Sequence, residues 1–159
     1  MGDRLTHVDE SGSARMVDVS AKQVTARSAT ASGRLRTTPE VVALLRGEGV
    51  PKGDALGVAR LAGIMGAKRT PDLVPLCHPI ALHGVDVTLD VVDEGVAIQA
   101  TVRTADRTGV EMEALTAVAV AGLALIDMVK AVDRAATITD VRVDAKEGGR
   151  SGTWHRDAR

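Results

Sequence analysis

The stretch TGVEMEALTAVAVAGLALIDMVKAVDR, residues 108–134, is apolar on every side in its middle and carries charges near both ends. Thr108 and Glu111 have the spacing of a capping box, which predicts a helix that begins at Gly109. A nearly uninterrupted apolar run covers residues 114–128. About fifteen apolar residues are too few to span a bilayer, so the helix is expected in a protein core or a subunit interface, and we favour the interface.

The charged residues of this stretch form two separate groups. Asp127 and Lys130 are three apart and share one helix face near the C-terminal end, whereas Glu111 and Glu113 lie near the N-terminal end. Fourteen residues separate Glu113 from Asp127, which corresponds to roughly 21 Å along a helix. Either there are two sites, or two antiparallel copies of the helix share one site. The simpler alternative is that Asp127 and Lys130 form a solvated ion pair at a helix end.

Helix signals continue upstream of this stretch. Thr38 and Pro39 have the types expected of an N-cap and a first helical residue, and they predict a short helix that ends near Gly47. Residues 54–68 repeat apolar side chains at helical spacing. This repeat predicts a second helix with one core-facing stripe, made of Ala55, Val58, Ala59, Leu61, Ala62 and Met65.

Strand signals surround these helices. Residues 16–19, and the chain from Val24 onward, have the composition of extended segments. Residues 85–91 and 96–102 alternate apolar and polar side chains on either side of Asp93-Glu94-Gly95, which predicts a β-hairpin. Residues 137–144 predict the last strand.

The element order strand, helix, strand, strand, helix, strand predicts an α+β fold. We expect a ferredoxin-like βαββαβ sandwich with an antiparallel sheet and an inserted short helix. The 159 residues are expected to form a single domain, with mobile ends at about residues 1–15 and 147–159.

Composition narrows the classes of ligand. The net charge is −1, which argues against a nonspecific nucleic-acid or membrane surface and favours a small molecule. The chain has no Phe or Tyr and only Trp154, so a nucleotide is expected to be held by charge and hydrogen bonds rather than by a row of aromatic rings. A lone Cys77 excludes an internal disulfide, and the start MGDRLTHVDE lacks an apolar signal region, so we expect a cytoplasmic protein.

The segment AKRTPDLVPLCHP, residues 67–79, carries further polar candidates. Pro75 and Pro79 bracket His78 and restrict its backbone, which suits a preorganised polar group, although a lone histidine is also compatible with a structural hydrogen bond. Lys68 is a candidate substrate-binding residue, with the alternative that it interacts with the helix dipole. Cys77 and His78 lack the second Cys/His cluster that a zinc site requires, so we predict no metal site.

Lys52 in VPKGDA and Lys146 in AKEGGRSG both lie near glycines, where a mobile backbone can fold cations around phosphate. The alternative is a solvated lysine in a turn. Neither GDALG nor GGRSG matches the P-loop pattern.

Taken together, four blocks resemble the successive signatures of the MoaC family, the cyclic pyranopterin monophosphate synthases of molybdenum cofactor biosynthesis. The resemblance covers roughly residues 5–152, and its combination of PLCHP, EMEAL and D-M-x-K-A is specific. The tail beyond Gly152 carries no family signature. The blocks are LTHVDESGSARMVDVSAK, GIMGAKRTPDLVPLCHP, TGVEMEALTAVAVAGLALIDMVKAVDR and VDAKEGGRSG.

The resemblance implies conversion of 3′,8-cyclo-7,8-dihydro-GTP, supplied by an upstream radical SAM enzyme, to cyclic pyranopterin monophosphate with loss of pyrophosphate. Ring opening, ring closure and cyclic phosphate formation all move protons, which suits lysines and carboxylates. Lys130 is implied to be the general acid, tuned by Asp127. The residues implied to bind substrate are Leu76, Cys77, His78, Met112 and Glu113, with Glu111 nearby. The residues implied to contact the triphosphate or to assist proton transfer are Lys52, Lys146 and Arg27.

The family also implies a homohexamer, a trimer of dimers with active sites at the dimer interfaces. No cofactor is expected to be required, although Mg²⁺ can accompany the triphosphate. Two other classes of function stay open from the residues alone. One is a noncatalytic module that binds a nucleotide or metabolite through its lysines, and the other is a metal-assisted hydrolase that uses His78 and acidic residues.

Overall fold

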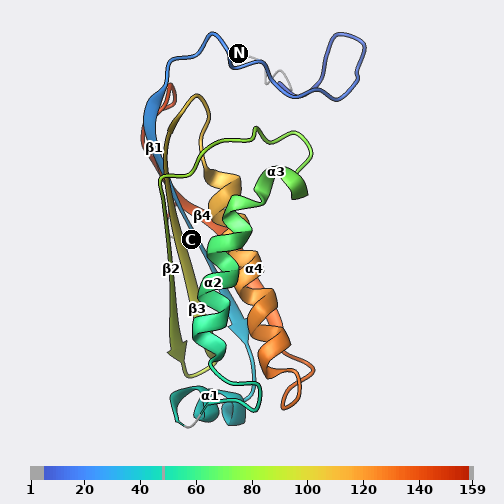
Figure 1. Cartoon of the computed structure of the whole chain (residues 1–159), viewed down its shortest axis with the longest axis vertical. Coiled ribbons are helices and arrows are strands. Elements are labelled where there is room, and N and C mark those ends of the chain that lie inside the picture. The colour runs from blue at the N-terminus through green and yellow to red at the C-terminus, as the bar shows by residue number, and fades with distance from the viewer. Residues whose placement is uncertain (1–5, 48, 158–159) are drawn as a thin grey trace.

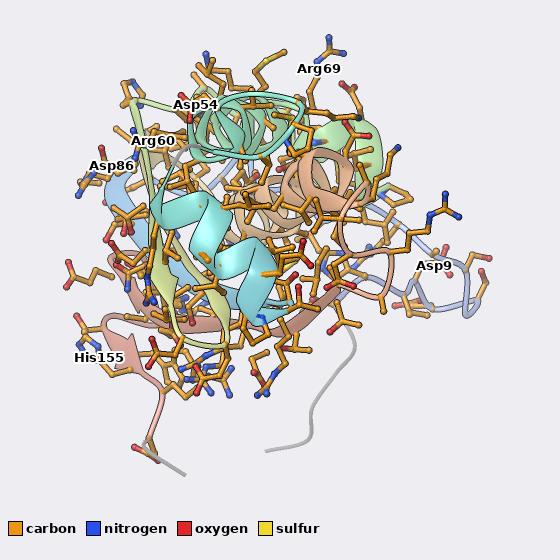
Figure 2. The ribbon with its side chains drawn as sticks, turned by 90° about the horizontal axis from the view of Figure 1, so that it is seen from below. Asp9, Asp54, Arg60, Arg69, Asp86 and His155 are labelled. Atoms are coloured by element: carbon orange, nitrogen blue, oxygen red, sulfur yellow. The ribbon has the colours of Figure 1, made fainter. Side chains whose placement is uncertain are left out.

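The computed structural model describes residues 6–47 and 49–157, and it has an α+β architecture (Figure 1). An open antiparallel sheet of five strands has the order β2-β3-β1-β4-β5, and its helices α2 and α4 cover one face (Figure 2). The elements are β1 (Thr25–Arg36), α1 (Pro39–Arg46), α2 (Ala55–Lys68), α3 (Thr70–Leu73), β2 (Gly84–Val92), β3 (Gly95–Asp106), α4 (Glu111–Val129), β4 (Thr137–Glu147) and β5 (Trp154–His155).

The predicted hairpin is confirmed as β2 and β3. The two strands pair from Gly84 opposite Arg103 to Val92 opposite Gly95. Gly95 has a φ of 149°, and a Cβ at this position would overlap the carbonyl oxygen of Leu35 on β1. Only glycine therefore allows β3 to begin this close to its neighbour.

Both predicted helix starts before the hairpin are also confirmed. The side chain of Thr38 accepts a hydrogen bond from the amide of Val41 at 3.4 Å, and Pro39 occupies the first helical position of α1. The Asp54 carboxylate accepts one from the amide of Gly57 at 2.9 Å. Each cap satisfies an amide that the first helical turn leaves without a partner.

The predicted core-facing stripe of α2 is wrong in part. Ala55 and Ala59 are buried, but Val58, Leu61 and Met65 are 45%, 64% and 61% exposed. The side of α2 that faces α4 carries small residues, because a Cβ at Gly63 would lie 2.9 Å from the carbonyl oxygen of Ala117 and one at Gly66 would lie 2.8 Å from the Cβ of Val120. The two backbones approach so closely that larger α2 side chains project outward.

The predicted capping box at the start of α4 is wrong. The helix begins at Glu111 with Val110 as N-cap, and no side chain makes a capping hydrogen bond. The Thr108 hydroxyl donates instead to the carbonyl of Gly109 at 3.2 Å. Glu111 is thus the first helical residue rather than the third, and its carboxylate pairs with Lys146 on β4.

The apolar character of α4 has an intramolecular cause, because the helix lies between α2 and the strands β1, β3 and β4. Within the described part of the chain, α4 alone is long and apolar enough to cross a membrane, and half of that segment is buried in the protein. One face of α4 remains exposed to solvent and forms an outward stripe along the helix. It runs through Met112 and Leu123, 40% and 60% exposed, to Asp127.

Asp133 joins the turn after α4 to the connection between β1 and α1. Its carboxylate accepts a hydrogen bond from the hydroxyl of Thr37 at 2.7 Å and another from the amide of Ala135 at 2.9 Å. The residue is 8% exposed. The hydrogen bond from Thr37, and then that from Ala135, lower the pKa of Asp133 below its ordinary value of 3.8.

We expect Asp133→Ala to lower the midpoint of thermal unfolding at pH 7, because it removes both hydrogen bonds. A carboxyl whose pKa is lower in the folded state stabilises the fold above its unfolded pKa, and that stabilisation is lost as the pH falls through the folded pKa. The difference between wild type and variant should therefore shrink below about pH 3.8. Glu94→Ala, at an exposed turn position, is the control for loss of one charge. A difference that does not change with pH would contradict this account.

Candidate active site

A pocket of about 560 Å³ lies at the N-terminal end of α4. The N-terminal segment crosses the same end of the molecule, next to α3 and the start of α4 (Figure 1). Seven of the residues implied by the family resemblance line this pocket: Leu76, Cys77, His78, Glu111, Met112, Glu113 and Lys146.

Sequence reasoning missed a second group of lining residues. Two segments that we assigned to the chain ends contribute to the wall, through Thr6 and His7 from the N-terminal segment and Trp154 from the C-terminal segment. Val17, Val19 and Lys22 lie between the first of these segments and β1. All of these except Trp154 lie in the block LTHVDESGSARMVDVSAK, but the resemblance gave them no role in the site, and only the tertiary arrangement brings them beside α4. The parts of the predicted mobile ends at residues 1–5 and 158–159 lie outside the described residues.

Glu113 is the buried acidic group of the pocket. It is 4% exposed, and burial raises the pKa of its carboxyl, with the charge of Glu111 acting in the same direction. Glu111 itself pairs with the ammonium of Lys146 at 3.2 Å. A carboxyl with a raised pKa beside an ion pair has the properties of a group that exchanges protons with a ligand.

The neighbouring loop presents Cys77 and His78. Burial raises the pKa of the Cys77 thiol, and the charge of Glu113 raises it further, so the thiol stays protonated and is a poor nucleophile. The Nε2 of His78 lies 2.6 Å from the carbonyl oxygen of Val17. Because a carbonyl only accepts, Nε2 carries the proton and donates, which fixes the ring and ties the loop to the N-terminal segment.

A second pocket of about 450 Å³ adjoins the first and shares Lys22 and Lys146 with it. Arg27 and Arg150 bring its basic side chains to four, and its described lining includes no carboxylate. The Nε of Arg27 donates to the carbonyl of Asp106 at 3.0 Å. Gly149, at a φ of 76°, allows the following loop to close onto the Arg27 guanidinium, which a Cβ would overlap. This basic pocket has the charge that a polyphosphate requires.

The remaining predicted residues form a separate cluster at the C-terminal end of α4. The Asp127 carboxylate pairs with Lys130 Nζ at 2.8 Å and with Lys52 Nζ at 3.0 Å. The hydrogen bond from Lys130, and then that from Lys52, lower the pKa of Asp127. All three side chains are about half exposed. Lys68 ends α2 as an exposed residue and lines neither pocket.

The candidate residues of one chain therefore lie in two places. The described lining of the two pockets includes none of the residues of the Lys52–Asp127–Lys130 cluster, which lies on the opposite end of α4, towards α1 (Figure 1). Among residues 6–47 and 49–157, no group of three or more His, Cys, Asp or Glu is arranged to hold a metal ion. A magnesium ion in the pocket would be held largely through ligand phosphates, as this ion commonly is.

Comparison with known proteins gives one consistent result. Residues 16–149 match the model of the MoaC family. A protein of Streptomyces coelicolor named cyclic pyranopterin monophosphate synthase is 71% identical over 97% of this chain and 91% of its own length. One of the same name from a Nocardioides species is 70% identical, with 96% of each chain covered. Cyclic pyranopterin monophosphate synthase 2 of Mycobacterium tuberculosis is 62% identical over 96% of this chain and 91% of its own length. The chain belongs to the MoaC family.

Proposed function

We propose that the protein converts 3′,8-cyclo-7,8-dihydro-GTP to cyclic pyranopterin monophosphate and pyrophosphate in molybdenum cofactor biosynthesis. The chain is an enzyme, since its relatives across nearly the whole length are synthases. The observation that carries the proposal is the union of an acid–base pocket around Glu113 with a basic pocket that shares Lys146. Such a pair of pockets suits a substrate with a heterocycle at one end and a triphosphate at the other.

The pocket residues are assigned by their chemistry. Lys146, Arg27 and the nearby basic side chains bind the triphosphate. Their positive charge stabilises the negative charge that develops on the leaving pyrophosphate as the cyclic phosphate closes. Glu113 and His78 contact the heterocycle, together with Leu76, Cys77, Met112 and Glu111. The reaction rearranges and closes rings without a net redox change, so we expect no redox cofactor, and Mg²⁺ can accompany the phosphates.

Lys130 is the proposed general acid, held by Asp127 and assisted by Lys52. This cluster lies at the opposite end of α4, and residues 113 and 127 are roughly 21 Å apart along the helix. We propose that a second copy of the chain supplies it. The outward stripe of α4 is apolar at Met112 and Leu123 and ends at the charged Asp127, so an antiparallel pair of these helices would place Lys130 of one chain near Glu113 of the other.

The wider assembly follows the same reasoning. We propose a homohexamer built as a trimer of such dimers, which acts in the cytoplasm on a substrate made by an upstream radical SAM enzyme. A lysine brought from a partner towards Glu113 would lower the pKa that burial raises in the single chain. The balance between burial and that lysine would then determine the working pH of the site.

The direct test is to incubate the purified protein with 3′,8-cyclo-7,8-dihydro-GTP and to follow pyrophosphate release. Release with formation of the pterin product is expected. Binding without turnover would favour a noncatalytic nucleotide-binding module. Turnover that is lost with a chelator and is not restored by Mg²⁺ would favour a hydrolase that depends on another metal.

We expect Lys146→Ala to weaken binding of the triphosphate substrate more than binding of an analogue that lacks the β- and γ-phosphates. The reason is that contacts to the pyrophosphate portion disappear with that portion. A loss of about tenfold or more for the triphosphate corresponds to one charge-assisted contact. Lys52→Ala should show the same pattern if the partner chain supplies Lys52.

Calorimetry with both ligands measures the effect of each substitution. Arg46→Ala is the control, because Arg46 pairs with Asp93 on the surface and lines neither pocket. Lys68→Ala is measured in parallel and decides whether Lys68 belongs to the site. Equal losses for both ligands would show that these lysines do not contact the terminal phosphates.

A further inference from the structure

The only aromatic side chain of the protein, Trp154, lies in the wall of the main pocket. It follows Gly152 and belongs to the short strand β5 at the edge of the sheet. The residue is 43% exposed. A large, partly exposed apolar ring in a pocket that Leu76 and Met112 also line can contact a ligand there.

Backbone pairing holds this ring in place. Trp154 pairs directly with Lys146 across the antiparallel strands β4 and β5. The amide of Arg156 donates to the carbonyl of Asp144 at 2.8 Å, and the amide of Gly152 donates to that of Gly149 at 3.2 Å. Because directly opposed residues of antiparallel strands point to the same face of a sheet, Trp154 and Lys146 both face the pocket.

Arg156 restricts the indole further. Its guanidinium carbon lies 5.6 Å from the centroid of the Trp154 ring, within the range of a cation–π contact. The Nε of Arg156 donates to the carbonyl of Val143 at 2.7 Å, which anchors the guanidinium. Arg156 therefore covers one face of the indole and fixes the orientation of the other.

We propose that Trp154 is the residue on which the heterocycle of the substrate stacks. The proposal rests on the proposed function, and it assigns a specificity role to a tail that carries no family signature in the sequence. Lys146 is shared by the main and the basic pockets, so a ligand with its phosphates in the basic pocket extends past Lys146 towards Trp154. Composition alone led us to expect a nucleotide held only by charge and hydrogen bonds, and the position of Trp154 adds one stacking surface.

Calorimetry with GTP and with tripolyphosphate separates the base from the phosphates. We expect Trp154→Ala to weaken GTP binding by about tenfold, the size of a lost base–aromatic stack, and to leave tripolyphosphate binding unchanged. Trp154→Phe keeps an aromatic face and should bind GTP within about threefold of wild type. His155→Ala is the matched control on the same strand, because His155 projects from the edge of the molecule into solvent (Figure 2).

Fluorescence gives a readout that needs no variant. Trp154 is the sole tryptophan and the chain has no tyrosine, so the intrinsic indole fluorescence comes from this ring alone. GTP should change the emission as the base stacks, and tripolyphosphate should change it much less. Saturation with GTP without an emission change would overturn the proposal, even if the alanine variant fails to fold.

The other outcomes also decide the proposal. Equal loss of GTP and tripolyphosphate in a folded Trp154→Ala protein, unchanged GTP binding in it, or no GTP binding by the wild type would each overturn the stacking role. None of these results affects turnover of the cyclic substrate by the wild-type protein. A wild type that turns over the substrate while Trp154→Ala binds GTP normally would retain the proposed function and exclude the role of Trp154.

Discussion

Lys130→Ala should reduce turnover of the cyclic dihydro-GTP substrate by about 10² or more, the size expected when a positioned acid or base is lost. The side chain is 54% exposed and lies just beyond the last residue of α4, so folding and assembly should be largely intact. Asp127→Ala should have a similar effect, because Asp127 holds the ammonium of Lys130 at 2.8 Å. Steady-state pyrophosphate release, with unfolding and size measurements on the same samples, checks both expectations.

Lys130→Arg separates proton transfer from charge. Arginine keeps the positive charge and can still pair with Asp127, but its guanidinium does not release a proton near neutral pH. If Lys130 donates a proton, the arginine variant should be about as inactive as the alanine variant while it still binds substrate. Arg134→Ala, at an exposed position four residues further along, is the control and should be active. Near-normal turnover in Lys130→Arg would show that charge alone is needed.

Activity should reappear when two inactive variants, Glu113→Ala and Lys130→Ala, are unfolded and refolded together. Each mixed dimer would contain one site with both groups intact and one site with neither. Random mixing makes about half of the dimers mixed, so about a quarter of all sites should recover by the symmetry of a two-fold interface. The effect is large because either variant alone has no intact site.

The structure supplies a matched control for this experiment. Lys146 and Glu113 of one chain line the same pocket, at the N-terminal end of α4. Refolding Glu113→Ala with Lys146→Ala should therefore give no activity beyond the average of the two variants refolded alone, because each pocket would carry one of the two changes. Failure of the first pair to recover, despite demonstrated mixed dimers, would mean that a single chain builds each active site and that the antiparallel pairing of α4 is wrong.

The secondary structure was largely predictable because its signals are local. Thr38 and Pro39 predict the start of α1, and the alternation of apolar and polar residues on both sides of Gly95 predicts the hairpin. The start of α4 was mispredicted because spacing alone does not determine which partner a side chain takes, and Glu111 pairs with Lys146 instead of capping the helix. The outward face of α2 was mispredicted because the close approach of α4 selects small residues at Gly63 and Gly66.

Some residues of the candidate site were identified from the sequence, and others only from the structure. Cys77, His78 and Glu113 were named from sequence blocks, and the structure brings them into one pocket. Lys22 lies in a quoted block but was given no role, and Trp154 lies beyond the last block, because both reach that pocket from segments far apart in the sequence. Their contribution depends on the course of the N-terminal segment and on the pairing of β5 with β4, for which neither segment has a periodic pattern.

The sequence by itself determined the α+β class, most helix and strand bounds and the family, because periodicity, caps and ordered motifs are properties of neighbouring residues. It also determined that Glu113 and Lys130 of one chain are far apart, because a helix has a fixed rise per residue. Only the tertiary structure decided which charges gather in one pocket. It alone showed that Glu113 is buried, that Lys146 pairs with Glu111 and that Trp154 faces the pocket. Burial and long-range pairing depend on how distant segments pack, which no local pattern specifies.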